Sequence, residues 1–191
     1  PKTIDPFDYD AFFANPCDFK VGVTNAETGK AEFYRKNSLK DGSTVLKASA
    51  SIPLVAPVVD YKGKKYLDGG TSSPIPVNEA LKDGCDKLIV VLTRHRKFIK
   101  PAIRFQTLCS LMMRKYPAMM ELLKRHHIVY RENQKEVARL EKEGKAWVIA
   151  SEKPLVIDRF EKNKEKLLVA YRQGFIDGEN FLKKYRAEFE K

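Results

Sequence analysis

The stretch Lys47–Pro76, KASASIPLVAPVVDYKGKKYLDGGTSSPIP, places one acid and two glycines directly after a short strand. Residues Lys65–Leu67 are bulky enough to form a strand that ends at Asp68. Gly69 and Gly70 then permit a sharp turn and the close approach of another chain segment. In open α/β sheets, ligands lie beyond the carboxyl ends of the strands, so Asp68 is a candidate catalytic group. The alternative is that Asp-Gly-Gly only turns the chain, as Asp-Gly pairs often do.

A particular order of motifs extends on both sides of Asp68. Before it come Ser-Ala-Ser, a proline-rich apolar segment and a hairpin; after it come a proline, the stretch Val77–Leu81 and an apolar strand over 87–93. This order resembles the distal half of the patatin-like phospholipase family, and its bacterial members in particular. Residues 15–35 resemble the strand pair before that acid, and residues 129–178 resemble the helical tail of a bacterial subgroup. The resemblance therefore covers nearly the whole chain.

The resemblance implies a fold, a reaction and a site. The implied fold is α/β, the C-terminal half of a patatin-like three-layer α/β/α sandwich over residues 1–100, with a mainly α-helical extension over 101–191. The implied protein is a lipid acyl hydrolase, in which a serine of a G-x-S-x-G elbow attacks the ester and an aspartate deprotonates that serine without a histidine. Asp68 takes the role of the aspartate, Gly69 and Gly70 shape its turn, and no cofactor is expected. Phospholipids, lysophospholipids and small esters all stay open as substrates.

The serine of that reaction has no counterpart in this sequence. None of the eight serines is flanked by glycine two residues away on both sides, and the family's glycine-rich oxyanion loop is missing. Ester cleavage needs a nucleophile, a base and oxyanion donors, so the chain supplies one of three parts. Both missing motifs precede the matched region in the family. We therefore expect the chain to begin in the middle of the fold, with the nucleophile outside it, and to be inactive alone; Ser72 and Ser73 should make capping or turn hydrogen bonds.

Positive charge is concentrated in one segment of the chain. The net charge is +11, yet residues 1–93 are balanced, whereas residues 94–131 hold ten basic residues, one acid and all four methionines. Basic and apolar residues mixed at helical spacing suit a helix that lies on an anionic membrane surface. The alternative is that the apolar residues are buried helix faces. Two series have the required spacing: Leu108, Leu111 and Met112, and Met120, Leu123, His127, Tyr130, Gln134 and Val137.

The charged segment supports a second hypothesis about function, from another class of protein. In this hypothesis the chain is a non-catalytic fragment or domain that binds membrane surfaces or protein partners through its basic tail. We expect no nucleic acid partner, because no helix-turn-helix, zinc or RNP pattern accompanies the charge. We also expect no metal: His126 and His127 are adjacent, so on a helix their side chains point about 100° apart, and His95 lies among arginines.

Composition fits a globular protein of the cytoplasm, membrane-peripheral if the basic segment meets lipid. The 191 residues are 43% hydrophobic, which suffices for a sizeable core. We expect no membrane span and no export signal, because there is no run of eighteen apolar residues and no apolar N-terminal segment. Cys17, Cys85 and Cys109 are odd in number and lack a C-x-x-C spacing, which predicts reduced core thiols.

The periodicity predicts short helices and strands up to Thr93 and mainly helices after it. Predicted strands are 19–24, 31–35, a hairpin over 55–67 that turns at 62–64, 88–92 and 146–150. Predicted helices are 7–14, 44–51, 76–84, 117–144, 159–173 and 179–190. The strand over 88–92 is apolar throughout, so it is expected to be buried on both faces. A sheet cut in the middle of its fold leaves an open edge, so we expect self-association or pairing with the missing half.

Overall fold

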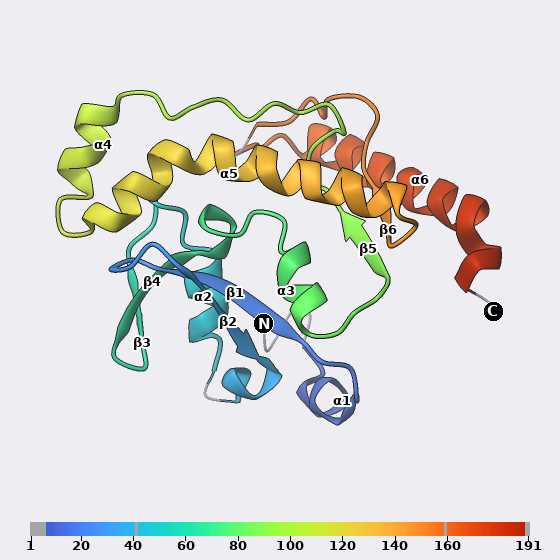
Figure 1. The fold of residues 1–191 in the computed structure, drawn as a ribbon, viewed down its shortest axis with the longest axis horizontal. Helices are drawn as coiled ribbons and strands as arrows, with labels where there is room; N and C mark the ends of the chain where they lie inside the picture. Colours follow the sequence, from blue (N-terminus) through green and yellow to red (C-terminus); the bar gives the residue numbers. More distant parts are fainter. Residues whose placement is uncertain (1–6, 41, 159, 190–191) are drawn as a thin grey trace. The chain divides into compact units, whose positions relative to one another are not determined.

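The computed structural model describes residues 7–40, 42–158 and 160–189, drawn as a ribbon in Figure 1. The chain forms two compact units. The first unit comprises the residues up to Pro74 together with Pro101–Tyr130, and the second comprises Ile75–Lys100 together with the residues from Arg131 onward. Each unit contains residues from before and after position 100. The sequence suggested a domain boundary at that position, and that boundary stays a prediction.

The first unit is built on a four-stranded antiparallel sheet with the strand order β2-β1-β4-β3. The strands are β1 Lys20–Asn25, β2 Ala31–Arg35, β3 Val59–Tyr61 and β4 Lys64–Asp68. The hairpin between β3 and β4 turns at Lys62 and Gly63, whose φ angles of 50° and 76° suit a two-residue hairpin loop. The unit also contains α1 Tyr9–Ala14, α2 Thr44–Ser49, α4 Gln106–Met112, the first half of α5 Pro117–Lys142, and 3-10 turns at Lys36–Leu39 and Gly69–Thr71.

Both faces of β4 are covered by a hydrophobic core. Tyr66 and Leu67 are successive residues of this strand, so their side chains point to opposite faces, and both are fully buried. Tyr66 belongs to a cluster formed with β1, α2 and β3. Leu67 belongs to a second group, here called the methionine cluster: Ala26, Leu67, Cys109, Met113, Met119, Met120 and Leu123. Asp68 therefore follows a strand that is held in place from both sides.

The second unit contains a pair of parallel strands and the longest helices. Its elements are α3 Val77–Lys82, β5 Leu88–Val91, β6 Ala146–Ile149, the second half of α5, and α6 Lys164–Phe189. In the parallel pair, Leu88 lies opposite Ala146 and Val91 lies opposite Ile149. Its buried apolar residues include Val77, Leu88, Val90, Val137, Leu140, Ala146, Val148 and Phe181.

The predicted α/β class with an α-helical C-terminal extension is confirmed. Most predicted strands and helices coincide with observed ones to within a few residues. The series that begins at Met120 is the buried face of α5, because Met120, Leu123, Tyr130 and Val137 are all buried. No helix in the described part of the chain combines the length and apolar character that spanning a bilayer requires.

Two apolar segments differ from an interpretation as buried residues: the Leu108 series, for which burial was one of two alternatives, and β5, for which burial on both faces was predicted. Leu108, Leu111 and Met112 are exposed, because α4 turns its other side toward the methionine cluster. The strand β5 is not buried on both faces: Leu88 and Val90 are buried, but the alternate residues Ile89 and Val91 are exposed. The reason is that β5 and β6 form a sheet of only two strands in the described structure, and only one face of that pair is covered.

Two further predictions about local structure are also wrong. The C-terminal tail forms one continuous helix, α6, where the sequence predicted two. Gly174 and Gly178 lie within it, since an isolated glycine costs only about 1 kcal/mol in a helix of otherwise good helix formers. Of the three cysteines, all of them free, only Cys109 is a core residue; Cys17 and Cys85 are exposed.

Candidate active site at Asp68

The backbone of Asp68 is fixed by hydrogen bonds from two other elements. Its N–H donates to the carbonyl of Ser51 at 2.8 Å, and its carbonyl accepts the Oγ1 hydrogen of Thr24 at 2.7 Å. Asp68 lies opposite Val23 in the antiparallel pairing of β4 with β1. The strand that carries Asp68 is thus antiparallel, so the rule about the ends of parallel strands does not explain its position. These contacts instead hold the residue at the end of a strand that is covered on both faces.

The two carboxylate oxygens of Asp68 differ in their contacts. Oδ1 accepts the backbone N–H of Gly70 at 2.8 Å and caps the 3-10 turn Gly69–Thr71. Oδ2 has no hydrogen-bond or ion-pair partner among the residues that the structure describes. The side chain is only partly buried. One oxygen is therefore oriented by the chain's own loop, and the other is available to an incoming proton donor.

Gly69 permits a close contact between the loop and β1. A Cβ atom at this position would lie 2.1 Å from the carbonyl oxygen of Gly22, far inside any real contact distance. A Cβ at Gly70 would lie 3.3 Å from Oδ1 of Asp68, which is tight but less severe. The close approach predicted from the sequence is observed at Gly69. The backbone of the Asp-Gly-Gly loop is held against β1 because no side chain separates them.

A contact between the hydroxyl groups of buried Thr24 and half-buried Ser72 supports the loop. The side chain of Thr24 is fully buried, and its Oγ1 lies 2.8 Å from Oγ of Ser72 and accepts the Ser72 N–H at 3.3 Å. The Ser72 hydroxyl also lies 3.5 Å from the carbonyl oxygen of Gly69, three residues earlier, which is the turn hydrogen bond predicted for this residue. Sequence reasoning missed Thr24, because Thr24 lies on the face of β1 opposite to Val21 and Val23 and so falls outside the alternation of buried apolar residues.

A histidine from the long helix α5 completes the contacts of the loop. Nε2 of His126 lies 3.0 Å from the carbonyl oxygen of Gly70, so it donates its hydrogen in this contact. The peptide groups of Gly70 therefore meet Asp68 on one side and His126 on the other. Sequence reasoning weighed His126 only as a metal ligand. The described residues contain no group of three histidine, cysteine or acidic side chains placed to hold a metal ion.

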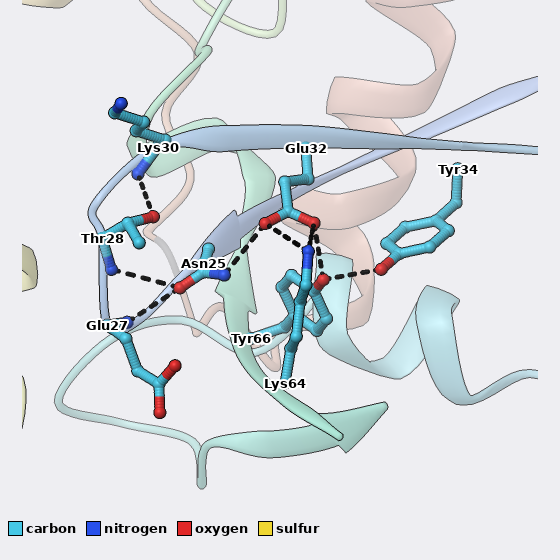
Figure 2. Close-up of polar contacts among 8 residues, drawn as sticks. All are labelled: Asn25, Glu27, Thr28, Lys30, Glu32, Tyr34, Lys64 and Tyr66. Atoms are coloured by element: carbon cyan, nitrogen blue, oxygen red, sulfur yellow. Dashed lines mark hydrogen bonds and ion pairs between the residues drawn. The ribbon is translucent and has the colours of Figure 1, made fainter. Parts of the chain in front are cut away.

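A second polar cluster lies on the same sheet and surrounds the carboxylate of Glu32 (Figure 2). Tyr66 Oη donates to Oε2 at 2.6 Å, Asn25 Nδ2 donates to Oε1 at 2.9 Å, and Lys64 Nζ donates at 3.0 Å. Tyr34 Oη lies 2.6 Å from Tyr66 Oη. Burial by itself raises the pKa of Glu32, but the hydrogen bonds from Tyr66, Asn25 and Lys64 outweigh it, so this pKa lies below its ordinary value.

The Glu32 cluster is suited to hold strands together. Burial, and then the hydrogen bond to Glu32, raise the pKa of Tyr66 well above its ordinary value, so its phenol stays protonated. The carboxylate of Glu32 already accepts from three donors. Neither group is placed to take a proton from a substrate. The cluster ties β1 and β2 to β4, the strand that ends at Asp68.

The second unit has a polar cavity of its own. It has a volume of ≈ 480 Å³ and lies between the end of β6 and one face of α6. Its lining includes Arg96, Ser151, Lys153, Asn180 and Lys184. Arg96 also forms an ion pair with Glu141 and donates to the carbonyl of Val148. Part of the basic segment is therefore engaged in holding this unit together.

Comparison with known families finds two matches at different positions. Residues 3–81 match the family described as Patatin-like phospholipase. Residues 116–190 match a family described as a Domain of unknown function (DUF6363). No curated protein matches the chain. The first match includes Asp68, Gly69 and Gly70 and confirms the resemblance noted in the sequence over that part of the chain.

Proposed function

We propose that this chain supplies Asp68 as the general base of a lipid acyl hydrolase with a Ser–Asp dyad, because residues 3–81 match the family described as Patatin-like phospholipase. That match supports the general class, hydrolysis of lipid esters. The role of Asp68 rests on one observation: Gly70 orients Oδ1 while Oδ2 is left available. Gly69 and Gly70 shape the site by holding the loop against β1.

In the proposed reaction, a serine oxygen attacks the ester carbonyl carbon while its proton passes to the carboxylate of Asp68. The same proton passes to the departing alcohol as the acyl–oxygen bond breaks, which leaves an acyl-serine. Water then attacks the acyl carbon and gives a proton to Asp68, and the serine leaves with that proton as the free acid forms. The contact with Gly70 keeps the carboxylate from rotating during these transfers.

We propose that the serine comes from outside these 191 residues. No serine of the sequence lies in a G-x-S-x-G elbow. The two serines that contact the Asp68 loop have other partners: Ser51 Oγ donates to the carbonyl of Lys47 at 2.8 Å, and Ser72 Oγ lies against Thr24. Neither hydroxyl is hydrogen-bonded to the carboxylate of Asp68 in the described structure. A cytoplasmic location, peripheral to the membrane, is part of the same proposal.

This proposal predicts that the chain alone does not hydrolyse p-nitrophenyl esters faster than buffer does. The reason is that the base is present without a nucleophile or an oxyanion hole. The measurement is the release of p-nitrophenol at several protein concentrations. Turnover that scales with protein and disappears after treatment with a serine-directed phosphonate would contradict it.

The decisive test is Asp68→Asn in the protein that carries both this chain and a G-x-S-x-G elbow. The amide matches the carboxylate in shape but accepts no proton, so the rate should fall by at least about 10²-fold while the melting temperature stays the same. Asp60→Asn is the matched control, since Asp60 is an exposed aspartate on the same hairpin, where it pairs with Lys65. It should keep full activity. Normal turnover by Asp68→Asn would make Asp68 a turn residue only.

A further inference from the structure

The short helix α4 carries a group of large apolar side chains that the core does not cover. Phe105 is 78% exposed, Leu108 58%, Leu111 66% and Met112 57%. Leu108, Leu111 and Met112 are three and four residues apart, so they share one side of the helix. The helix also has a buried side, because Cys109 and the following Met113 belong to the methionine cluster. The apolar surface of α4 is thus wider than its contact with the core.

Phe105 precedes the helix in an unusual backbone conformation. Its φ angle of 53° and ψ angle of 47° lie in the left-handed region, which residues with a side chain rarely adopt. The phenyl ring gains no burial from this arrangement, since it is the most exposed of the four side chains. Strained backbone of this kind is found most often where a protein meets a ligand. The conformation places an aromatic ring beside the exposed leucines rather than in the core.

The charged residues of α4 and its flanking segments, residues 101–118, are of one sign. Arg104, Arg114 and Lys115 are exposed, and no acidic residue occurs between Pro101 and Ala118. An apolar helix surface flanked in the sequence by arginine and lysine complements an anionic bilayer, because the apolar side chains enter the acyl boundary while the cations meet the head groups. A second copy of the chain would bring the same three cations against these. Charge therefore favours a lipid surface over self-docking at this place.

We propose that Phe105, Leu108, Leu111 and Met112, with Arg104, Arg114 and Lys115, form a docking surface for an anionic phospholipid bilayer. These residues, the α4 surface, lie between the two stretches that match known families. The buried side of the same helix shares the methionine cluster with Leu67, the residue before Asp68. The unit that carries the proposed base is therefore the unit that meets the lipid.

The α4 surface is only one part of the basic segment, residues 94–131. Met113, Met119 and Met120 are core residues, and Arg96 and Lys124 form ion pairs with Glu141 and Glu121. The inference rests on the proposed function in so far as it names the surface that brings the base to its substrate. Its test measures binding and needs no turnover. Failure of the lipid inference and failure of the acyl-hydrolase proposal are therefore distinguishable.

The experiment is co-sedimentation of the chain with vesicles of phosphatidylcholine, with and without phosphatidylglycerol. We expect binding only to the anionic vesicles, strongest at low salt, because the interaction of exposed cations is screened over about 8 Å at physiological ionic strength. Leu108→Ser with Leu111→Ser should weaken binding by at least about tenfold. The control is Leu168→Ser with Leu182→Ser, which removes two exposed leucines from α6; it should bind as the original chain does.

The cations of the α4 surface are tested separately. Arg114→Glu with Lys115→Glu should weaken binding at low salt by at least about tenfold, since each basic residue near an anionic surface contributes about a fivefold factor. The control is Lys142→Glu with Lys183→Glu, which changes the net charge by the same amount at two exposed positions outside the α4 surface. It should weaken binding far less. Equal losses in the two charge variants would show a nonspecific response to net charge and would overturn the proposed surface.

Insertion of Phe105 gives an independent readout. The chain has one tryptophan, Trp147, so Phe105→Trp in a Trp147→Phe background gives a single probe in the α4 surface. Its emission should shift to shorter wavelength with anionic vesicles and stay unchanged with neutral ones. No shift, or no preference for anionic vesicles at low salt, would overturn the proposal. A dimer that light scattering detects for the original chain, and that is lost in the variant with serine at positions 108 and 111, would also overturn it. The α4 surface would then bind a second copy of the chain.

Discussion

The antiparallel sheet of the first unit and the parallel strand pair of the second differ in how many of their faces are covered. Around Tyr66 and Leu67, both faces of β4 are buried in hydrophobic clusters. In β5 only Leu88 and Val90 are buried, and Ile89 and Val91 are exposed by 53% and 67%. A residue at the end of β4 is therefore held rigidly, whereas β5 presents an apolar face to solvent. The proposed base thus lies at the end of a strand covered on both faces, and self-association through the exposed face of β5 stays a prediction.

The largest effect should follow from breaking the covered sheet at its closest contact. Gly69→Ala places a methyl group on the carbonyl of Gly22, so the loop or β1 must move, and we expect a loss of about 3 kcal/mol in the free energy of unfolding. Gly174→Ala is the control, because a Cβ there meets nothing within 4 Å. It should stabilise α6 by about 0.5–1 kcal/mol. Urea unfolding of both variants measures the difference, and equal stabilities would contradict the close contact.

Two neighbouring valines sharpen the comparison within β5. Val90→Ala removes buried methyl groups and should cost about 2 kcal/mol. Val91→Ala should change the stability of the monomer by less than about 0.5 kcal/mol, since that side chain is exposed. If the exposed face is an assembly surface, Val91→Ala should instead reduce self-association in light scattering. A chain that stays monomeric at all concentrations would argue against assembly through β5.

The smallest effect concerns the Glu32 cluster and depends on pH. The pKa of Glu32 is lowered in the folded protein, so its stabilisation is fully present above the ordinary value of 4.5 and is lost as pH falls through the lower folded value. Glu32→Gln should cost about 1–2 kcal/mol at pH 7. This cost should shrink as the pH falls from 4.5 through the lower folded pKa of Glu32. Glu27→Gln, at an exposed position on the same hairpin, is the control and should change the free energy of unfolding at pH 7 by less than about 0.5 kcal/mol. Melting temperatures measured from pH 3 to 7 provide the test.

Local patterns predicted much of this fold, and the failures have physical causes. Alternation located β1, β2 and the hairpin of β3 and β4, and the spacing from Met120 to Val137 identified the buried face of α5. The same spacing misled at Leu108, because periodicity identifies an apolar helix face but not what covers it. The apolar run of β5 likewise predicts burial on both faces. Whether a strand is covered depends on the elements packed against it, and these are not visible in the run itself.

The candidate site was predictable only in part. The strand, the acid and the two glycines occur together in the sequence, so Asp68, Gly69 and Gly70 were identifiable as a group. Thr24 and His126 were not, because they are far from Asp68 in the sequence and contact the loop only through folding. A hydrogen bond from a helix to a loop carbonyl leaves no periodic signal.

The contact between His126 and Gly70 has a consequence for how this protein is divided. His126 lies in the stretch that matches the family of unknown function, and Gly70 lies in the patatin-like stretch. The methionine cluster crosses the same border, with Leu67 on one side and Met119 on the other. A truncation after residue 81 or 115 would remove His126, Met119 and Met120, and with them part of the cover of Leu67. The two matched stretches therefore share one packed cluster, and a graft of the Asp68 loop that keeps these contacts includes residues 117–126 of α5 as well.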